Sequence, residues 1–194
     1  RHEYLPGYQC GRVPALGVIV FLLVTGGSGS GKSAFAEKLT ASLGEGQRIY
    51  IATMMCFDQE GKERIARHRR MRQDKHFETR ERYTDMAHLY VPEDSVLLLE
   101  CMSNLTANEM YTSSGAGEIT VYAVVEGIHH LLLTARHLVV VTNEIFSDGG
   151  DYDSETVKYQ RYLGEINTRL AQMADGFYEV VYGIPICRKG DDII

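Results

Sequence analysis

Eight residues near the start of the chain constrain its fold more than any other feature. They are Gly26-Gly27-Ser28-Gly29-Ser30-Gly31-Lys32-Ser33, which match the pattern G-x-x-x-x-G-K-[ST] between an apolar run and an amphipathic segment. Glycines let consecutive backbone N–H groups curl around phosphate oxygens, and a helix that begins here adds a favourable dipole. In such a loop the Lys32 ammonium reaches the β- and γ-phosphates, and the Ser33 hydroxyl ligates Mg²⁺. The segment therefore predicts a nucleotide-binding loop between a buried strand and a helix.

Apolar runs of strand length alternate with longer amphipathic segments along the rest of the chain. This alternation is typical of an α/β fold with a mostly parallel sheet flanked by helices. The expected strands are Val18–Thr25, Arg48–Thr53, Ser95–Glu100, His137–Asn143 and Phe177–Gly183. The expected helices are Lys32–Leu43, Asp58–Gln73, Ser103–Met110, Glu118–Arg136 and Ser154–Ala174. By composition, Thr112–Gly117 and Ser147–Asp153 are expected to be loops.

The length of the chain limits how many domains it can form. Its 194 residues suit one α/β domain with a buried core, which we expect to span residues 18–194. Residues 1–17 lack an initial Met and are rich in proline and glycine. We expect them to be a poorly structured extension or a cloning remnant without function.

Charge and cysteine spacing exclude several classes of protein. The net charge of -6 argues against nucleic acid as the main partner, because nucleic-acid-binding proteins usually have a basic balance. The cysteines lie far apart without a C-x-x-C pair, which excludes the common zinc spacings and favours a reduced, cytoplasmic setting. The apolar run Val18–Val24 is too short to span a membrane.

Two expected strands end in polar residues that are candidates for the site. Glu100 follows four apolar residues and would lie at the sheet edge where nucleotides bind, near a metal ion, a sugar or a base. A solvated carboxylate that ends a strand is the alternative. Asn143 and Glu144 repeat the pattern after the next strand and are weaker candidates.

The segment from Arg64 to Arg72 surrounds one histidine with arginines. On a helix Arg64, His68 and Arg72 share one face, where their like charges repel one another unless an anion binds. Neighbouring guanidinium groups should lower the pKa of His68 and keep its imidazole neutral. A neutral imidazole can attack the α-phosphorus of a nucleoside triphosphate. The alternatives are a solvated basic face and a nucleic-acid patch in which His68 plays no part.

Taken together, these segments resemble the bifunctional adenosylcobinamide kinase / adenosylcobinamide-phosphate guanylyltransferase family. The resemblance spans about residues 18–187 and rests on Thr25–Ser33, Arg48–Thr53, Arg64–Arg72, Leu98–Cys101, Val141–Glu144 and Tyr162–Ala174. It implies a RecA-like P-loop fold, a homotrimer, and ATP and GTP as substrates with Mg²⁺. The implied reactions are phosphorylation of adenosylcobinamide and transfer of GMP from GTP to that phosphate, in the biosynthesis of cobalamin.

The resemblance also implies roles for individual residues. The family's guanylylated histidine corresponds to His68, beside Lys32 as the other catalytic residue. The family's nucleotide contacts fall on Gly26–Ser33, Ala52, Thr53, Met54, Arg69, Arg70, Met71, Arg72, Glu81 and Glu100. Many members have arginine where this chain has Gly29. Two other functions stay open, a P-loop kinase for another small metabolite and a nucleotide-switched binding module.

Overall fold

The computed structural model describes residues 19–55, 76–146 and 150–190, together with Glu63, Ala66 and Arg70. Those three isolated residues are helical and exposed, and the other residues of the predicted helix Asp58–Gln73 lie outside the described part. The extension expected at residues 1–17 also lies outside it.

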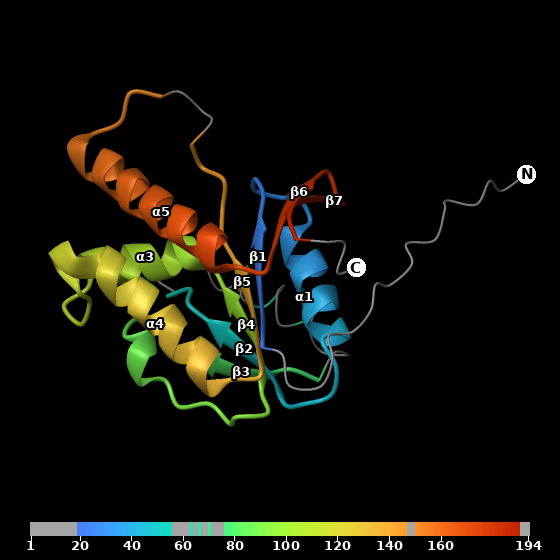
Figure 1. Cartoon of the computed structure of the whole chain (residues 1–194). Coiled ribbons are helices and arrows are strands. Elements are labelled where there is room, and N and C mark those ends of the chain that lie inside the picture. The colour runs from blue at the N-terminus through green and yellow to red at the C-terminus, as the bar shows by residue number, and fades with distance from the viewer. Residues whose placement is uncertain are drawn as a thin grey trace, which may run out of the picture.

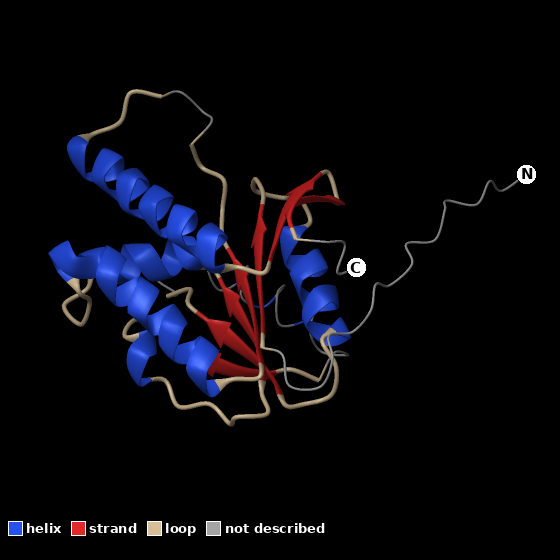
Figure 2. Cartoon of the chain, in the orientation of Figure 1, coloured by secondary structure: helices blue, strands red, loops and turns tan. Residues whose placement is uncertain are grey.

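A seven-stranded sheet forms the centre of the described structure (Figure 2). Its strands are β1 (Val20–Thr25), β2 (Arg48–Ala52), β3 (Glu78–Glu81), β4 (Val96–Glu100), β5 (His137–Val141), β6 (Gly176–Val181) and β7 (Ile184–Lys189). They are ordered β3-β2-β4-β5-β1-β6-β7, and every neighbouring pair is parallel except β6 with β7. The predicted mostly parallel sheet is therefore confirmed.

Helices cover both faces of this sheet (Figure 1). On one face lies α1 (Lys32–Ser42), and on the other lie α3 (Met102–Tyr111), α4 (Thr120–Thr134) and α5 (Ser154–Met173). Of two short 3-10 turns, η2 (Met86–His88) lies between β3 and β4, and η3 (Gly117–Ile119) directly precedes α4. α5 begins after Asp153 because its carboxylate accepts hydrogen bonds from the backbone N–H groups of Glu155 and Thr156.

Strand β1 shows how the two-layer core follows from the sequence. Its side chains alternate between faces, so Val20, Leu22 and Val24 pack toward α1 while Phe21 and Leu23 pack toward the other helices. All five are at most 3% exposed. A strand covered on both faces must be apolar throughout, which is the pattern that predicted burial here.

The structure departs from the predicted elements mainly at the sheet edges. β3 and β7 were not predicted: β3 is polar and largely exposed, and β7 carries Pro185, which an edge strand tolerates. The expected strand Phe177–Gly183 ends instead at Val181, where a hairpin turn begins. The expected helix Glu118–Arg136 is a 3-10 turn followed by α4. Other boundaries shift by one or two residues.

Candidate active site

The phosphate-binding motif forms the connection between β1 and α1, where the sequence predicts it. A Cβ atom on Gly26 would lie 2.6 Å from the Val180 carbonyl oxygen, so this position accepts only glycine without movement. Gly31 has a φ of 91° and caps α1 without a side-chain hydrogen bond, and no acidic residue occupies the first turn. The first backbone N–H groups of α1 are therefore left for an external anion such as phosphate.

Lys32 begins α1 and is buried beside the loop. Its ammonium group donates a hydrogen bond to the Gly27 carbonyl oxygen at 3.0 Å. Burial lowers the pKa of Lys32 below its usual value, and the nearby Glu100 carboxylate offsets part of that effect. The side chain therefore holds a poorly hydrated positive charge within the loop, which favours binding of an anion.

The hydroxyl of Ser33 faces the carboxylate that ends β4. Ser33 Oγ donates to Glu100 Oε1 at 2.5 Å, and the Tyr50 hydroxyl donates to Glu100 Oε2 at 3.2 Å. With its proton directed at Glu100, the Ser33 oxygen presents its lone pairs elsewhere. Hydroxyl and carboxylate oxygens are the hard donors that Mg²⁺ prefers, so Ser33 and Glu100 suit such an ion. Within the described residues no group of three His, Cys, Asp or Glu side chains is placed to hold a metal.

A cavity of about 610 Å³ opens over these residues. Its walls come from the phosphate loop, from the segments that follow β4 and β5, and from Met54 after β2. The lining residues are Ser28, Gly29, Ser30, Gly31, Lys32, Ser33, Ala34, Met54, Glu100, Cys101, Asn104, Asn143, Glu144 and Ile145. The cavity is large enough for the phosphates of a nucleotide together with part of an acceptor.

Asn143 and Cys101 both line this cavity. The Asn143 amide donates to Ser103 Oγ at 2.5 Å, and the Cys101 thiol lies 3.0 Å from the same oxygen. Burial raises the pKa of Cys101, and burial also raises the pKa of Tyr159, whose hydroxyl donates to the Ser103 carbonyl, to about 12. Cys101 is thus held as a thiol, which argues against it as a nucleophile.

The remaining candidates spread along the carboxyl edge of the sheet. Register places Ala52 opposite Glu100 on one side and Glu81 on the other. Glu81 therefore lies about 10 Å from Glu100, two strand spacings away, is exposed, and accepts a hydrogen bond from Tyr83 at 2.8 Å. Arg70 is exposed. His68, Arg69, Met71 and Arg72 lie outside the described residues.

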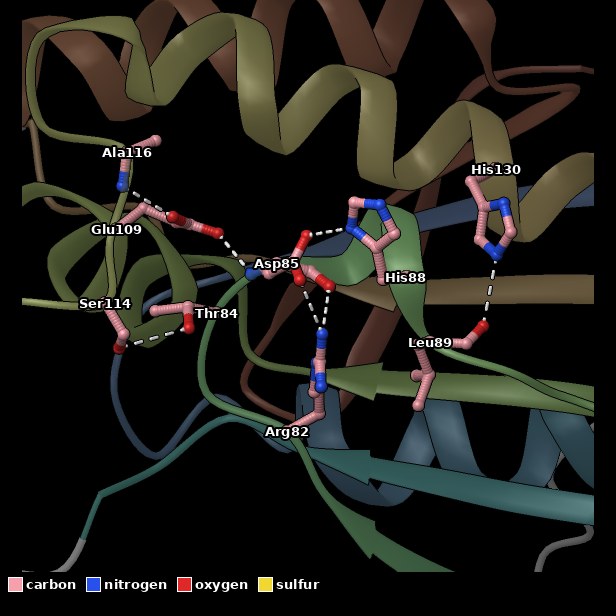
Figure 3. A network of polar contacts seen from close by, with 9 residues as sticks. All are labelled: Arg82, Thr84, Asp85, His88, Leu89, Glu109, Ser114, Ala116 and His130. Carbon is pink, nitrogen blue, oxygen red and sulfur yellow. Dashed lines mark hydrogen bonds and ion pairs between the residues drawn. The ribbon is translucent and has the colours of Figure 1, made fainter.

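Sequence reasoning missed two buried residues of α3 that hold this edge together. The Asn108 amide donates to the carbonyl oxygens of Thr53 at 2.8 Å and Tyr83 at 3.0 Å. Glu109 accepts from the backbone N–H groups of Asp85 at 2.6 Å and Ala116 at 2.9 Å, as Figure 3 shows. These contacts tie the segments after β2 and β3 to one helix.

A sequence signal for Glu109 exists. Met102, Leu105 and Glu109 follow helical spacing, and the first two are fully buried, so a carboxylate falls on the buried stripe of α3. Such a group must be hydrogen-bonded, which indicates a structural role. Asn108 offers no comparable signal because its partners are distant in sequence.

Comparisons with known proteins agree with this geometry. Residues 22–187 match the family described as "Cobinamide kinase / cobinamide phosphate guanyltransferase". The chain is 31% identical to the bifunctional adenosylcobalamin biosynthesis protein CobU of Escherichia coli (strain K12) over 182 residues, which cover 86% of this chain and 98% of that protein. It is 30% identical to the protein of the same description from Salmonella typhimurium (strain LT2), with the same coverage.

The fold is also similar to that of solved structures. One of them, a solved ATPase domain, superimposes with a TM-score of 0.51 at 11% identity, covering 89% of this chain and 78% of that one. This likeness shows a RecA-like P-loop fold and nothing more specific. No helix within the described ranges is long and apolar enough to cross a membrane. By the family match and its two relatives, the chain belongs to the cobinamide kinase / cobinamide phosphate guanyltransferase family and is an enzyme of that kinase and guanylyltransferase class.

Proposed function

We propose that this chain phosphorylates adenosylcobinamide with a nucleoside triphosphate and then transfers GMP from GTP to the product through His68. The observation that carries the proposal is the phosphate loop, with Lys32 and the Ser33–Glu100 pair facing one cavity. A loop that binds phosphate beside an open cavity suits transfer of a phosphate group to a second substrate. Family membership supplies the acceptor.

In the kinase step, the acceptor hydroxyl attacks the γ-phosphorus of the triphosphate. A new P–O bond forms as the bond from the γ-phosphorus to the bridging oxygen breaks, the nucleoside diphosphate leaves, and the acceptor proton passes to solvent. Lys32 stabilises negative charge on the transferring group, and the N–H groups at the start of α1 hold the phosphates in place. Ser33 and Glu100 would hold Mg²⁺, which neutralises phosphate charge when bound.

In the second step, a ring nitrogen of His68 attacks the α-phosphorus of GTP. A P–N bond forms, the bond between the α-phosphorus and the bridging oxygen breaks, and pyrophosphate leaves. An oxygen of adenosylcobinamide phosphate then attacks the same phosphorus, so the P–N bond breaks and adenosylcobinamide-GDP forms. Burial raises the pKa of Cys101, so this pocket thiol is disfavoured as the carrier of GMP.

The other contacts to GTP follow from the family resemblance. We assign them to Ala52, Thr53, Met54, Arg69, Arg70, Met71, Arg72, Glu81 and Glu100. The register of β2, β3 and β4 is compatible with this assignment, because Ala52, Glu81 and Glu100 lie at one level of the sheet edge. The homotrimer and the cytoplasmic setting belong to the same proposal.

The test uses GTP labelled on its α-phosphate. The parent protein should take up label that is acid-labile and base-stable, as a phosphoramidate is, and should pass it to adenosylcobinamide phosphate. His68→Asn should take up none, while kinase turnover persists at least in part because phosphoryl transfer needs no covalent histidine. His129→Asn, a change at an exposed histidine of α4, is the matched control and should label like the parent.

Each outcome decides between stated alternatives. A labelled His68→Asn protein would place the carrier at another residue. A parent that phosphorylates adenosylcobinamide without taking up label would leave a single-activity kinase. A parent that binds nucleotide but turns over neither substrate would favour the nucleotide-switched module.

A further inference from the structure

The turn between β6 and β7 carries an aromatic residue in an unusual conformation. Val181 pairs with Ile184, so Tyr182 and Gly183 alone form the loop. Their φ angles are 50° and 80°, the positive values that both central residues of a type I′ turn require. Glycine and asparagine are the usual residues there, and a bulky side chain at positive φ is uncommon.

Packing within the chain does not account for Tyr182. Its side chain is 95% exposed, the highest value among the exposed large apolar and aromatic residues of the described part. An exposed ring gains nothing from burial, and its backbone is strained by the positive φ. Strained residues of this kind cluster at sites that bind ligands. The conformation and exposure of Tyr182 therefore indicate that its ring contacts a bound molecule.

The turn lies directly against the phosphate loop. The Gly183 N–H donates to the Ser30 carbonyl oxygen at 2.7 Å. A Cβ atom on Gly31 would lie 3.2 Å from Gly183 Cα, and one on Gly26 would lie 2.6 Å from the Val180 carbonyl oxygen. The hairpin therefore holds Tyr182 at a set position next to the phosphate loop.

Tyr182 and the cavity lie on opposite sides of the phosphate loop. In the sheet β1 has β5 and then β4 on one side, and β6 and β7 on the other. Glu100, Asn143 and the other cavity residues outside the loop follow β2, β4 and β5. A triphosphate whose γ-phosphate faces Glu100 and the acceptor therefore extends its base away from the cavity, toward the hairpin.

We propose that Tyr182 stacks on the base of the nucleoside triphosphate bound in the phosphate loop. This inference rests on nucleotide binding by that loop, as the proposed function does. Stacking uses the π-face that every base has and reads no hydrogen-bonding edge. Tyr182 therefore strengthens binding of a nucleoside triphosphate in the phosphate loop without selecting one base over another.

The test compares nucleotides with inorganic triphosphate, which has no base. Calorimetric titration should show that Tyr182→Ala weakens ATP binding by about tenfold or more, the range for loss of one stacked base. Affinity for inorganic triphosphate should stay within twofold. Tyr182→Phe should bind ATP like the parent, since the ring alone stacks. Tyr90→Ala is the matched control, because Tyr90 is 81% exposed and its carbonyl accepts a hydrogen bond from Arg80 of β3, at the opposite edge of the sheet.

Tyr182→Gly guards against a folding defect, because glycine adopts the positive φ without strain. This variant should be at least as stable as the parent and should lose nucleotide affinity as the alanine variant does. Unchanged ATP affinity in a folded Tyr182→Gly protein would overturn the proposal, as would an equal loss for inorganic triphosphate. A protein that stacks nucleotide on Tyr182 but fails to phosphorylate adenosylcobinamide would keep this inference and refute the proposed function.

Discussion

The two ends of the sheet's carboxyl edge are built in different ways. At the β1–β6 end the contacts join main-chain atoms to main-chain atoms. The Gly183 N–H donates to the Ser30 carbonyl, and Gly26 packs on the Val180 carbonyl. At the β2–β3 end, the side chains of Asn108 and Glu109 in α3 form hydrogen bonds with main-chain groups of the segments that follow these strands. Both ends carry candidate nucleotide contacts. Main-chain contacts position them at one end, and side-chain hydrogen bonds position them at the other.

Because of this difference, the two ends should tolerate different amino-acid substitutions. Backbone contacts at the phosphate loop demand glycine at fixed positions but survive most changes in side chains elsewhere. The β2–β3 end depends on two adjacent residues of one helix, so a single substitution there should disturb several contacts together. We therefore expect changes at the first end to alter chemistry while stability is kept, and changes at the second to alter both.

The largest effect is expected from Lys32→Ala at the phosphate loop. Loss of the ammonium group removes charge stabilisation of the transferring phosphoryl group, so kinase kcat/KM should fall by about 10²–10³-fold. The free energy of unfolding should change little, because removing a desolvated charge also removes its burial cost. Steady-state kinetics and denaturant unfolding measure the two quantities. Lys38→Ala changes an exposed lysine of the same helix and should match the parent in kinase turnover and in stability. Near-parental turnover by a folded Lys32→Ala protein would refute the catalytic role of Lys32.

A smaller effect is expected from Ser33→Ala. Its hydroxyl is bonded to Glu100, and the pair is the proposed Mg²⁺ site. The Mg²⁺ concentration for half-maximal kinase activity should rise by about tenfold or more. Ser42→Ala, at the exposed end of α1, should leave the Mg²⁺ titration unchanged. Superimposable titrations for Ser33→Ala and the parent would exclude a metal role for the hydroxyl.

Asn108→Ala probes the β2–β3 end. It leaves the Thr53 and Tyr83 carbonyl oxygens without their amide donor, which should cost about 1–3 kcal/mol of unfolding free energy. Because Thr53 and Glu81 are proposed GTP contacts, guanylyl transfer should weaken more than the kinase step. Denaturant unfolding and separate assays of the two steps test this. Ser114→Ala, in the loop after α3, should change neither the unfolding free energy nor the two activities. If Asn108→Ala lost kinase activity and guanylyl transfer equally, the two ends of the sheet edge would not act separately.

The two ends also differ in how far they could be predicted from the sequence. The phosphate loop was predictable because Gly26, Lys32 and Ser33 lie within eight residues and their roles follow from local backbone geometry. Glu100 was predictable because it ends an apolar strand. β3 was missed since an exposed edge strand needs no apolar pattern. Asn108 was missed because it bonds Thr53, 55 residues away, and only the folded sheet brings them together.

The smallest effect is expected far from both ends, at the amino edge of the sheet. His137 begins β5, is 5% exposed, and accepts a hydrogen bond from the Val20 N–H at 3.2 Å through Nδ1. An accepting nitrogen carries no proton, so the folded protein needs a neutral imidazole. Burial lowers the pKa of His137, and the charge of Arg136 lowers it further. This residue therefore couples folding to pH, and it lies away from the candidate nucleotide contacts at both ends of the carboxyl edge.

The sign of the pH effect follows from that lowered pKa. The unfolded chain takes up a proton near the reference value of about 6.5, whereas the folded protein does so only at lower pH. The stabilising effect of neutral His137 is thus fully present above about pH 6.5 and is lost as pH falls through the folded pKa. His137→Asn keeps an acceptor for the Val20 N–H but cannot titrate, so its unfolding free energy should fall less between pH 7 and pH 5 than that of the parent. His129→Asn, at an exposed site, should keep the parental slope. If His137→Asn kept that slope too, the coupling of folding to pH would not run through His137.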